Sequence, residues 1–140
     1  MAAVTRGTKG GLTTPEPPNN ARVGAGYATA AGTAPCPCHF TANGGVTPSI
    51  GTAANAAAVV DGWVLKDFEA GECVTLYADV TVSYGNGAAI TPGAFYYLGT
   101  TAGGLDTATT TGGTVPIARG VPDNSLFGAK QTKLRVKASY

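Results

Sequence analysis

The chain has 140 residues, which suits one domain or a small domain with a long appendage. Charged residues make up only 12% of it and Gly occurs 21 times, so the composition favours short strands and turns over helices. The formal net charge of +1 is too small to predict nucleic-acid binding. No run approaches the roughly 18 apolar residues of a membrane span, and no signal-peptide run begins the chain. The sequence therefore predicts a protein made in a cytoplasm that binds neither nucleic acid nor membrane.

Residues 1–60 show no sustained helical or strand periodicity. Residues 13–20 read Thr-Thr-Pro-Glu-Pro-Pro-Asn-Asn, which predicts a stiff polyproline-like linker. Turn signals such as Asn43-Gly44-Gly45 follow. We expect residues 1–60 to form an extended, mostly irregular arm rich in Gly, Ala, Thr and Pro. The alternative is an irregular lobe that packs on itself.

From residue 61 onward, short apolar runs alternate with regular turn signals. Between Cys73 and Tyr84, apolar and polar side chains alternate with period two, which predicts one long half-buried strand. Asn86-Gly87 then predicts a hairpin turn. Further strands are expected at 95–98, 115–121 and 132–138, each bounded by Gly or Pro. Residues 61–140 are therefore predicted to be an all-β body, a compact barrel or sandwich.

The predicted last strand carries three cations on one face, Lys133, Arg135 and Lys137. One interpretation is a solvated strand face whose charges discourage aggregation through the sheet edge. The other is a basic ridge that docks on an acidic neighbour, such as the loop of Glu69 and Glu72 in another copy of the chain. On this second interpretation, the five residues form a capsid or subunit interface.

The sequence offers little support for catalysis. Cys36, Cys38 and His39 are of metal-ligand type, but structural zinc sites usually space paired cysteines by two or more residues. Buried thiols in a loop are the simpler interpretation, and we expect no metal, no cofactor and no enzymatic activity. Aromatic residues allow another function, a carbohydrate- or receptor-binding module on a virion or cell surface. Its platform would consist of Tyr77, Tyr84, Tyr96 and Tyr97.

Three segments in the last 80 residues or so form a recognisable series. They are Ala-Gly-Glu-Cys-Val-Thr-Leu at 70–76, Ala-Ile-Thr-Pro-Gly-Ala-Phe-Tyr-Tyr-Leu at 89–98, and Val-Pro-Ile-Ala-Arg-Gly-Val at 115–121. Followed by a final Lys/Arg strand, this series resembles small bacteriophage head decoration proteins, also called cement proteins, which have a β-tulip-like or compact barrel body. Residues 1–60 fall outside the resemblance.

The resemblance implies a structural virion protein on the outer capsid surface, made in the cytoplasm of a bacterial host. Such a protein binds the major capsid protein, bridges neighbouring subunits and stabilises the shell. It commonly acts as a homotrimer or another small homo-oligomer. On this basis we expect the chain to bind both the capsid and further copies of itself.

Overall fold

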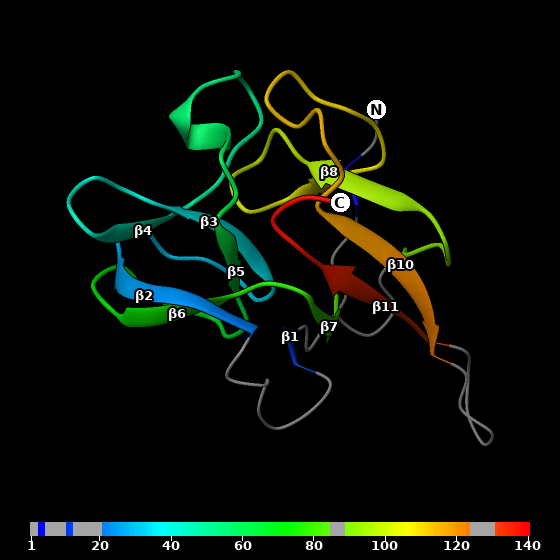
Figure 1. The fold of residues 1–140 in the computed structure, drawn as a ribbon, viewed down its shortest axis with the longest axis horizontal. Helices are drawn as coiled ribbons and strands as arrows, with labels where there is room; N and C mark the ends of the chain where they lie inside the picture. Colours follow the sequence, from blue (N-terminus) through cyan, green and yellow to red (C-terminus); the bar gives the residue numbers. More distant parts are fainter. Residues whose placement is uncertain (1–2, 5–10, 13–20, 85–88, 124–130) are drawn as a thin grey trace.

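A computed structural model describes residues 3–4, 11–12, 21–84, 89–123 and 131–140. Nearly all of the regular structure is β, apart from a short 3-10 turn, η2 (Ala56–Ala58). The strands form a closed barrel and a six-stranded sheet, which lie next to each other along the longest axis of the molecule (Figure 1). The predicted all-β fold is therefore confirmed. The predicted linker at 13–20 and the Asn86-Gly87 turn lie outside the described residues.

The barrel has five strands in the order β2-β4-β3-β5-β6, closed by pairing of β6 with β2. All pairs are antiparallel except β2 with β4. The strands are β2 (Arg22–Ala28), β3 (Cys36–Phe40), β4 (Gly45–Pro48), β5 (Gly62–Val64) and β6 (Cys73–Tyr77).

The second unit is an antiparallel sheet in the order β1-β7-β11-β10-β8-β9. Residues near the N-terminus lie at both edges of this sheet. β1 forms one edge by pairing with β7, and Ala3 bridges Asp106 of β9 at the other edge. The strands are β1 (Gly11–Leu12), β7 (Val80–Ser83), β8 (Phe95–Leu98), β9 (Leu105–Asp106), β10 (Ala118–Asp123) and β11 (Gln131–Val136).

The long strand predicted from Cys73 to Tyr84 is divided between the two units. Its first half is β6 in the barrel, and its second half is β7 in the six-stranded sheet. The break falls at Asp79, whose φ of 61° lies in the left-handed region that Asp tolerates better than most residues. The alternation continues through the break, so the sequence pattern did not reveal it. The apolar side chains of this one alternating segment therefore pack in two cores, those of β6 in the barrel and those of β7 in the six-stranded sheet.

The predicted arm over 1–60 differs from the structure between residues 21 and 60. Three of the five barrel strands, β2, β3 and β4, come from this stretch, so the barrel cannot form without it. The sequence pattern did not reveal β2, because this strand places Gly24 and Gly26 toward the interior in place of bulky apolar residues. The Phe40 ring occupies the space at Gly24, where a Cβ atom would lie 2.8 Å from Phe40 Cζ.

Two hydrophobic clusters fill the molecule, one in the barrel and one on the inner face of the sheet. Trp63 belongs to barrel strand β5, yet its fully buried side chain is part of the sheet cluster. Its indole Nε1 donates a hydrogen bond of 2.9 Å to the carbonyl of Lys137 in the C-terminal segment. This residue therefore ties the barrel to the sheet. Within the described residues, no helix is long and apolar enough to cross a membrane.

Candidate functional site

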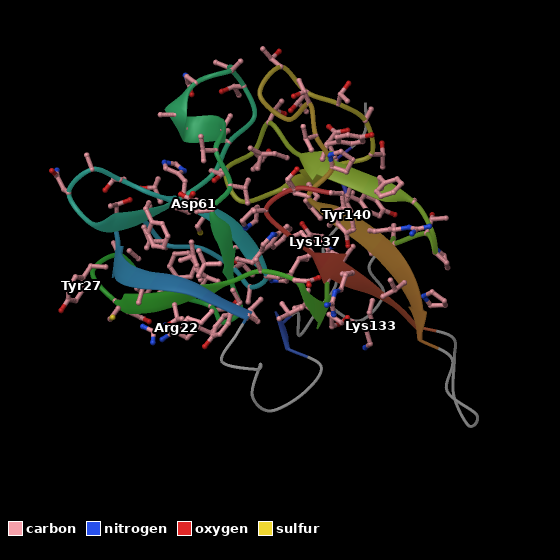
Figure 2. The ribbon with its side chains drawn as sticks, viewed as in Figure 1. Arg22, Tyr27, Asp61, Lys133, Lys137 and Tyr140 are labelled. Carbon is pink, nitrogen blue, oxygen red and sulfur yellow. The ribbon has the colours of Figure 1, made fainter. Side chains whose placement is uncertain are left out.

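The outer face of the six-stranded sheet gathers most of the described cations. Strand β11 alternates, with Leu134 and Val136 fully buried on the inner face. Because side chains alternate along a strand, Lys133, Arg135 and Lys137 lie on the opposite, outer face. The three predicted cations therefore share one face of the sheet. Figure 2 labels two of them, Lys133 and Lys137.

A row of four side chains crosses this face at one level. The strand registers pair Thr81 with Arg135, Arg135 with Arg119, and Arg119 with Phe95. Arg119 and Arg135 are therefore directly opposed across β10 and β11, an arrangement that destabilises a sheet through like-charge repulsion. The two guanidinium groups reduce this repulsion by pointing apart, since that of Arg119 lies over the ring of Phe95 and that of Arg135 reaches Asp79 and Thr81.

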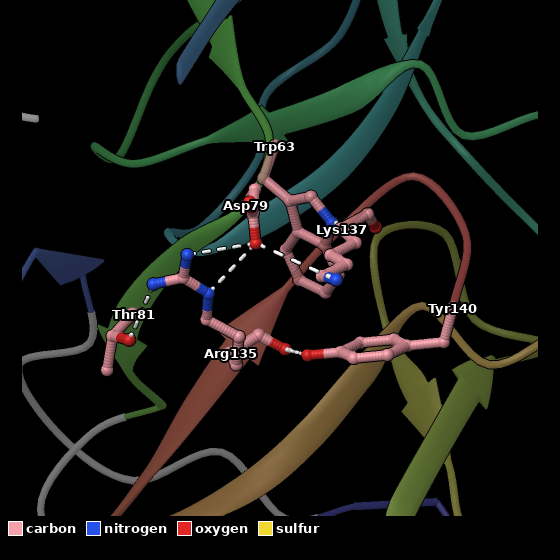
Figure 3. Close-up of polar contacts among 6 residues, drawn as sticks. All are labelled: Trp63, Asp79, Thr81, Arg135, Lys137 and Tyr140. Carbon is pink, nitrogen blue, oxygen red and sulfur yellow. Dashed lines mark hydrogen bonds and ion pairs between the residues drawn. The ribbon is translucent and has the colours of Figure 1, made fainter. Parts of the chain in front are cut away.

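One carboxylate organises part of this face (Figure 3). Asp79 Oδ1 accepts hydrogen bonds from Arg135 Nε at 3.0 Å and lies 2.9 Å from its Nη2. Lys137 Nζ lies farther away, at 3.8 Å from the same oxygen. Arg135 Nη1 also donates to Thr81 Oγ1 at 3.2 Å. These contacts fix the guanidinium plane of Arg135.

Two exposed aromatic rings accompany the cations. Phe95 is 42% exposed and Tyr140 is 37% exposed, and their rings meet edge to face with centroids 5.7 Å apart. Arg119 lies 5.1 Å from the centroid of Phe95, and Lys137 lies 4.8 Å from that of Tyr140. Cations held over aromatic faces combine charge with apolar contact area. We call Arg119, Lys133, Arg135, Lys137, Phe95 and Tyr140 the basic face.

Tyr140 is held in place by its own polar contacts. Its hydroxyl donates to the carbonyl of Arg135 at 2.7 Å, and its amide donates to the carbonyl of Pro116 at 2.9 Å. Burial raises the pKa of the Tyr140 hydroxyl above its ordinary value, partly opposed by the positive charge of Arg135. The ring therefore remains neutral at physiological pH and stays packed on the face.

The other two predicted interface residues, Glu69 and Glu72, lie in the loop before β6 of the barrel. This loop is far from the basic face, which is on the six-stranded sheet. Glu72 precedes β6, its carbonyl accepts from the amide of Ala28, and its carboxylate forms an exposed ion pair with Lys66 at 3.4 Å. In Figure 2 the loop lies at the end of the molecule where Tyr27 is labelled, since Tyr27 pairs with Cys73. Lys133 is labelled on the sheet, toward the other end of the molecule. Any contact between the loop and the basic face would have to join two copies of the chain.

The weakly predicted metal ligands do not converge on one point. Cys36 and Cys38 are buried on the same face of β3 with their sulfurs 3.7 Å apart, and the pKa of the Cys38 thiol is strongly raised by its hydrogen bond with Cys36 and by burial. His39 points to the other side of the strand, where its Nδ1 is 3.2 Å from Ser49 Oγ. Among the described residues, no group of three potential ligands could hold a metal ion.

The tyrosine platform predicted for a carbohydrate-binding module is not formed. Tyr84 and Tyr96 are each only 2% exposed and belong to the sheet core, where the hydroxyl of Tyr96 accepts from the amide of Thr91. Tyr77 is half-buried and packs against the same cluster. Phe95 and Tyr140 are instead the exposed aromatic residues that contact cations among the described residues.

A cavity of about 390 Å³ lies between the barrel and the sheet. It is lined by Val4, the thiol-bearing Cys36, Tyr84 and the Gly- and Thr-rich loop 99–104. Since Val4 donates its amide to Leu105 at 3.1 Å, the N-terminal segment already occupies one wall. No charged side chain lines this cavity among the described residues, so the basic face remains the stronger candidate.

Sequence reasoning missed Arg119, Phe95 and Tyr140 as members of the site. They come from β10, β8 and the C-terminal segment, and only strand register brings them next to β11. The alternation of small buried Ala118 and Gly120 around Arg119 was the available signal that this cation faces outward.

Comparisons of the chain with protein-family models, with curated proteins and with solved structures found no match. The basic face is therefore interpreted from its own residues.

Proposed function

We propose that this chain is a non-catalytic structural protein of a phage virion, which binds the outside of an assembled capsid and stabilises the shell by bridging capsid subunits. The basic face is the docking surface, and its partner is a carboxylate-bearing surface of the major capsid protein. The observation that carries the proposal is the row in which Arg119 and Arg135 stand opposed beside the exposed ring of Phe95.

The composition of this surface fits protein binding. Arg and aromatic residues are enriched where protein interfaces concentrate their binding energy, whereas isolated exposed lysines contribute little. Arg135 is already oriented by Asp79 and Thr81, so it loses less conformational freedom when a partner binds. The resemblance of the residues after 60 to head decoration proteins supports a capsid as the partner.

Repetition on a capsid lattice would strengthen a modest contact. Each copy offers a small surface, but many identical contacts on one particle raise the overall avidity. A protein that bridges subunits then resists their separation, because its binding energy is lost when the shell opens.

The test is saturation binding to empty capsids assembled from the major capsid protein encoded in the same genome. A decoration protein should reach a fixed number of copies per capsid and raise the temperature at which the shell disrupts. Lys133→Glu with Arg135→Glu should abolish saturation at low ionic strength. Lys133→Arg with Arg135→Lys keeps the charge and serves as the control. Equal binding by the charge-reversed and control variants would refute docking through the basic face.

A further inference from the structure

The two arginines of the basic face are opposed in strand register, but their side chains are engaged to different degrees. Arg135 uses all three of its guanidinium nitrogens inside the chain (Figure 3). Its Nε and Nη2 contact Asp79 Oδ1, and its Nη1 donates to Thr81 Oγ1. A carboxylate of a partner would therefore have to compete with Asp79 for this group. Arg135 contributes positive charge to the face, but its donors are already directed elsewhere.

Arg119 leaves its terminal nitrogens available. Within the described residues its side chain makes one hydrogen bond, from Nε to the carbonyl oxygen of Gly93, and this bond is long at 3.4 Å. No hydrogen bond or ion pair to another described residue engages Nη1 or Nη2. Because the residue is also exposed, both of these nitrogens can donate to a group outside the chain.

The aromatic pair beside Arg119 makes this position different from an ordinary surface cation. The guanidinium carbon lies 5.1 Å from the centroid of Phe95, whose ring meets that of Tyr140 edge to face. The ring contact restricts the motion of the long side chain and excludes water from one side of it. An exposed ion pair contributes little when both side chains must first be ordered, so a cation that is already held forms a stronger one.

We propose that Arg119 is the residue of the basic face that binds the carboxylate of the partner, through paired hydrogen bonds from Nη1 and Nη2. This inference rests on the proposed docking function and names the group that recognises the partner. A guanidinium group matches a carboxylate with two parallel N–H···O bonds, which the ammonium group of Lys cannot form. The partner segment then has an Asp or Glu next to an apolar side chain, which packs on the exposed rings of Phe95 and Tyr140.

A carboxylate fits the surroundings of Arg119 better than a phosphate of nucleic acid does. Both anions match a guanidinium group, but proteins that bind nucleic acid neutralise several phosphates along a strand. Two neighbouring cations, Arg135 and Lys137, already contact Asp79. One available guanidinium group beside two apolar rings therefore favours a single carboxylate on a protein surface.

Arginine-directed footprinting of the full chain tests this assignment. Phenylglyoxal modifies guanidinium groups, and peptide mass spectrometry reports each site separately. In the free chain Arg119 should react several-fold faster than Arg135, whose nitrogens are engaged. On saturated capsids Arg119 should become protected, while the exposed Arg22 of the barrel continues to react. Equal rates for Arg119 and Arg135 in the free chain, or an unchanged rate for Arg119 on capsids, would overturn the inference.

Substitutions that keep the charge separate the paired hydrogen bonds from simple attraction. Arg119→Lys should weaken capsid binding by roughly fivefold, and Arg135→Lys should weaken it less. Arg22→Lys is the matched control outside the basic face and should bind like the unmodified chain. If Arg119→Lys bound as tightly as Arg22→Lys, the paired contact would be refuted while docking through the basic face could stand.

Two other results have different meanings. If the unmodified chain failed to saturate capsids, the proposed function would fail, and this inference with it. If single-stranded DNA protected Arg119 from phenylglyoxal and capsids did not, the bound group would be a phosphate, and the assignment of a carboxylate would be refuted.

Discussion

Replacing Trp63 by Phe tests whether the barrel and the sheet form one cooperative unit. The substitution removes the indole N–H that donates 2.9 Å to the Lys137 carbonyl, and it leaves a gap in the sheet cluster. Losing one partner of a buried hydrogen bond costs about 1–3 kcal/mol. The smaller ring adds roughly 1 kcal/mol for lost contacts, at the low end of large-to-small core changes. We expect the free energy of unfolding to fall by about 2–4 kcal/mol.

The assay is urea unfolding followed by far-ultraviolet circular dichroism, because Trp63 is the only Trp and its fluorescence is lost in the variant. The wild-type transition should be single and should coincide when followed by fluorescence and by circular dichroism. Tyr27→Phe is the control, since its exposed hydroxyl has no part in the core and its removal should change stability by less than about 0.5 kcal/mol. A Trp63→Phe change as small as that control would refute the coupling of the two units through this side chain.

Three further outcomes follow from the structure. Deleting residues 1–50 removes three of the five barrel strands, so the remaining chain should show no cooperative thermal transition by calorimetry, and a sharp transition would contradict the closed barrel. One thiol per native chain, Cys73, should react with a disulfide reagent near pH 8, and all three should react in denaturant, because Cys36 and Cys38 are buried and the pKa of Cys38 is strongly raised. A second fast thiol in the native chain would contradict this burial. Asp79→Asn should change the free energy of unfolding by less than about 1 kcal/mol, because the ion pair is exposed and Asn also tolerates a positive φ. The same variant should bind capsids more tightly at low salt, and weaker binding would mean that Asp79 itself contacts the partner.

The strands after residue 61 could be predicted because each carries its own alternation or turn signal. Phe95–Leu98 and Gln131–Val136 appear in the structure close to where the pattern placed them. The division of the long strand at Asp79 could not be predicted, since a single residue with positive φ leaves the period of two intact on both sides.

The barrel strands before residue 60 were missed for a different reason. The space at Gly24 is filled by the Phe40 ring and the space at Gly26 by the main chain of Gly44, so β2 has no apolar period to detect. In the candidate site, the alternation on β11 predicted that Lys133, Arg135 and Lys137 share a face. The addition of Arg119 and Phe95 depends on pairing between strands that are distant in sequence. Local patterns therefore found one strand of the face, and tertiary register supplied the rest.

The most direct test of the account is the salt dependence of capsid binding by Arg119→Glu compared with Lys66→Glu. Both variants change the net charge equally, but Arg119 lies on the basic face and Lys66 lies beside Glu72 on the barrel. The account predicts that Arg119→Glu binds roughly tenfold more weakly than Lys66→Glu at low ionic strength. The difference should shrink near 1 M salt, where the Debye length is about 3 Å. Equal affinities for the two variants at low salt would contradict the assignment of the basic face as the docking surface.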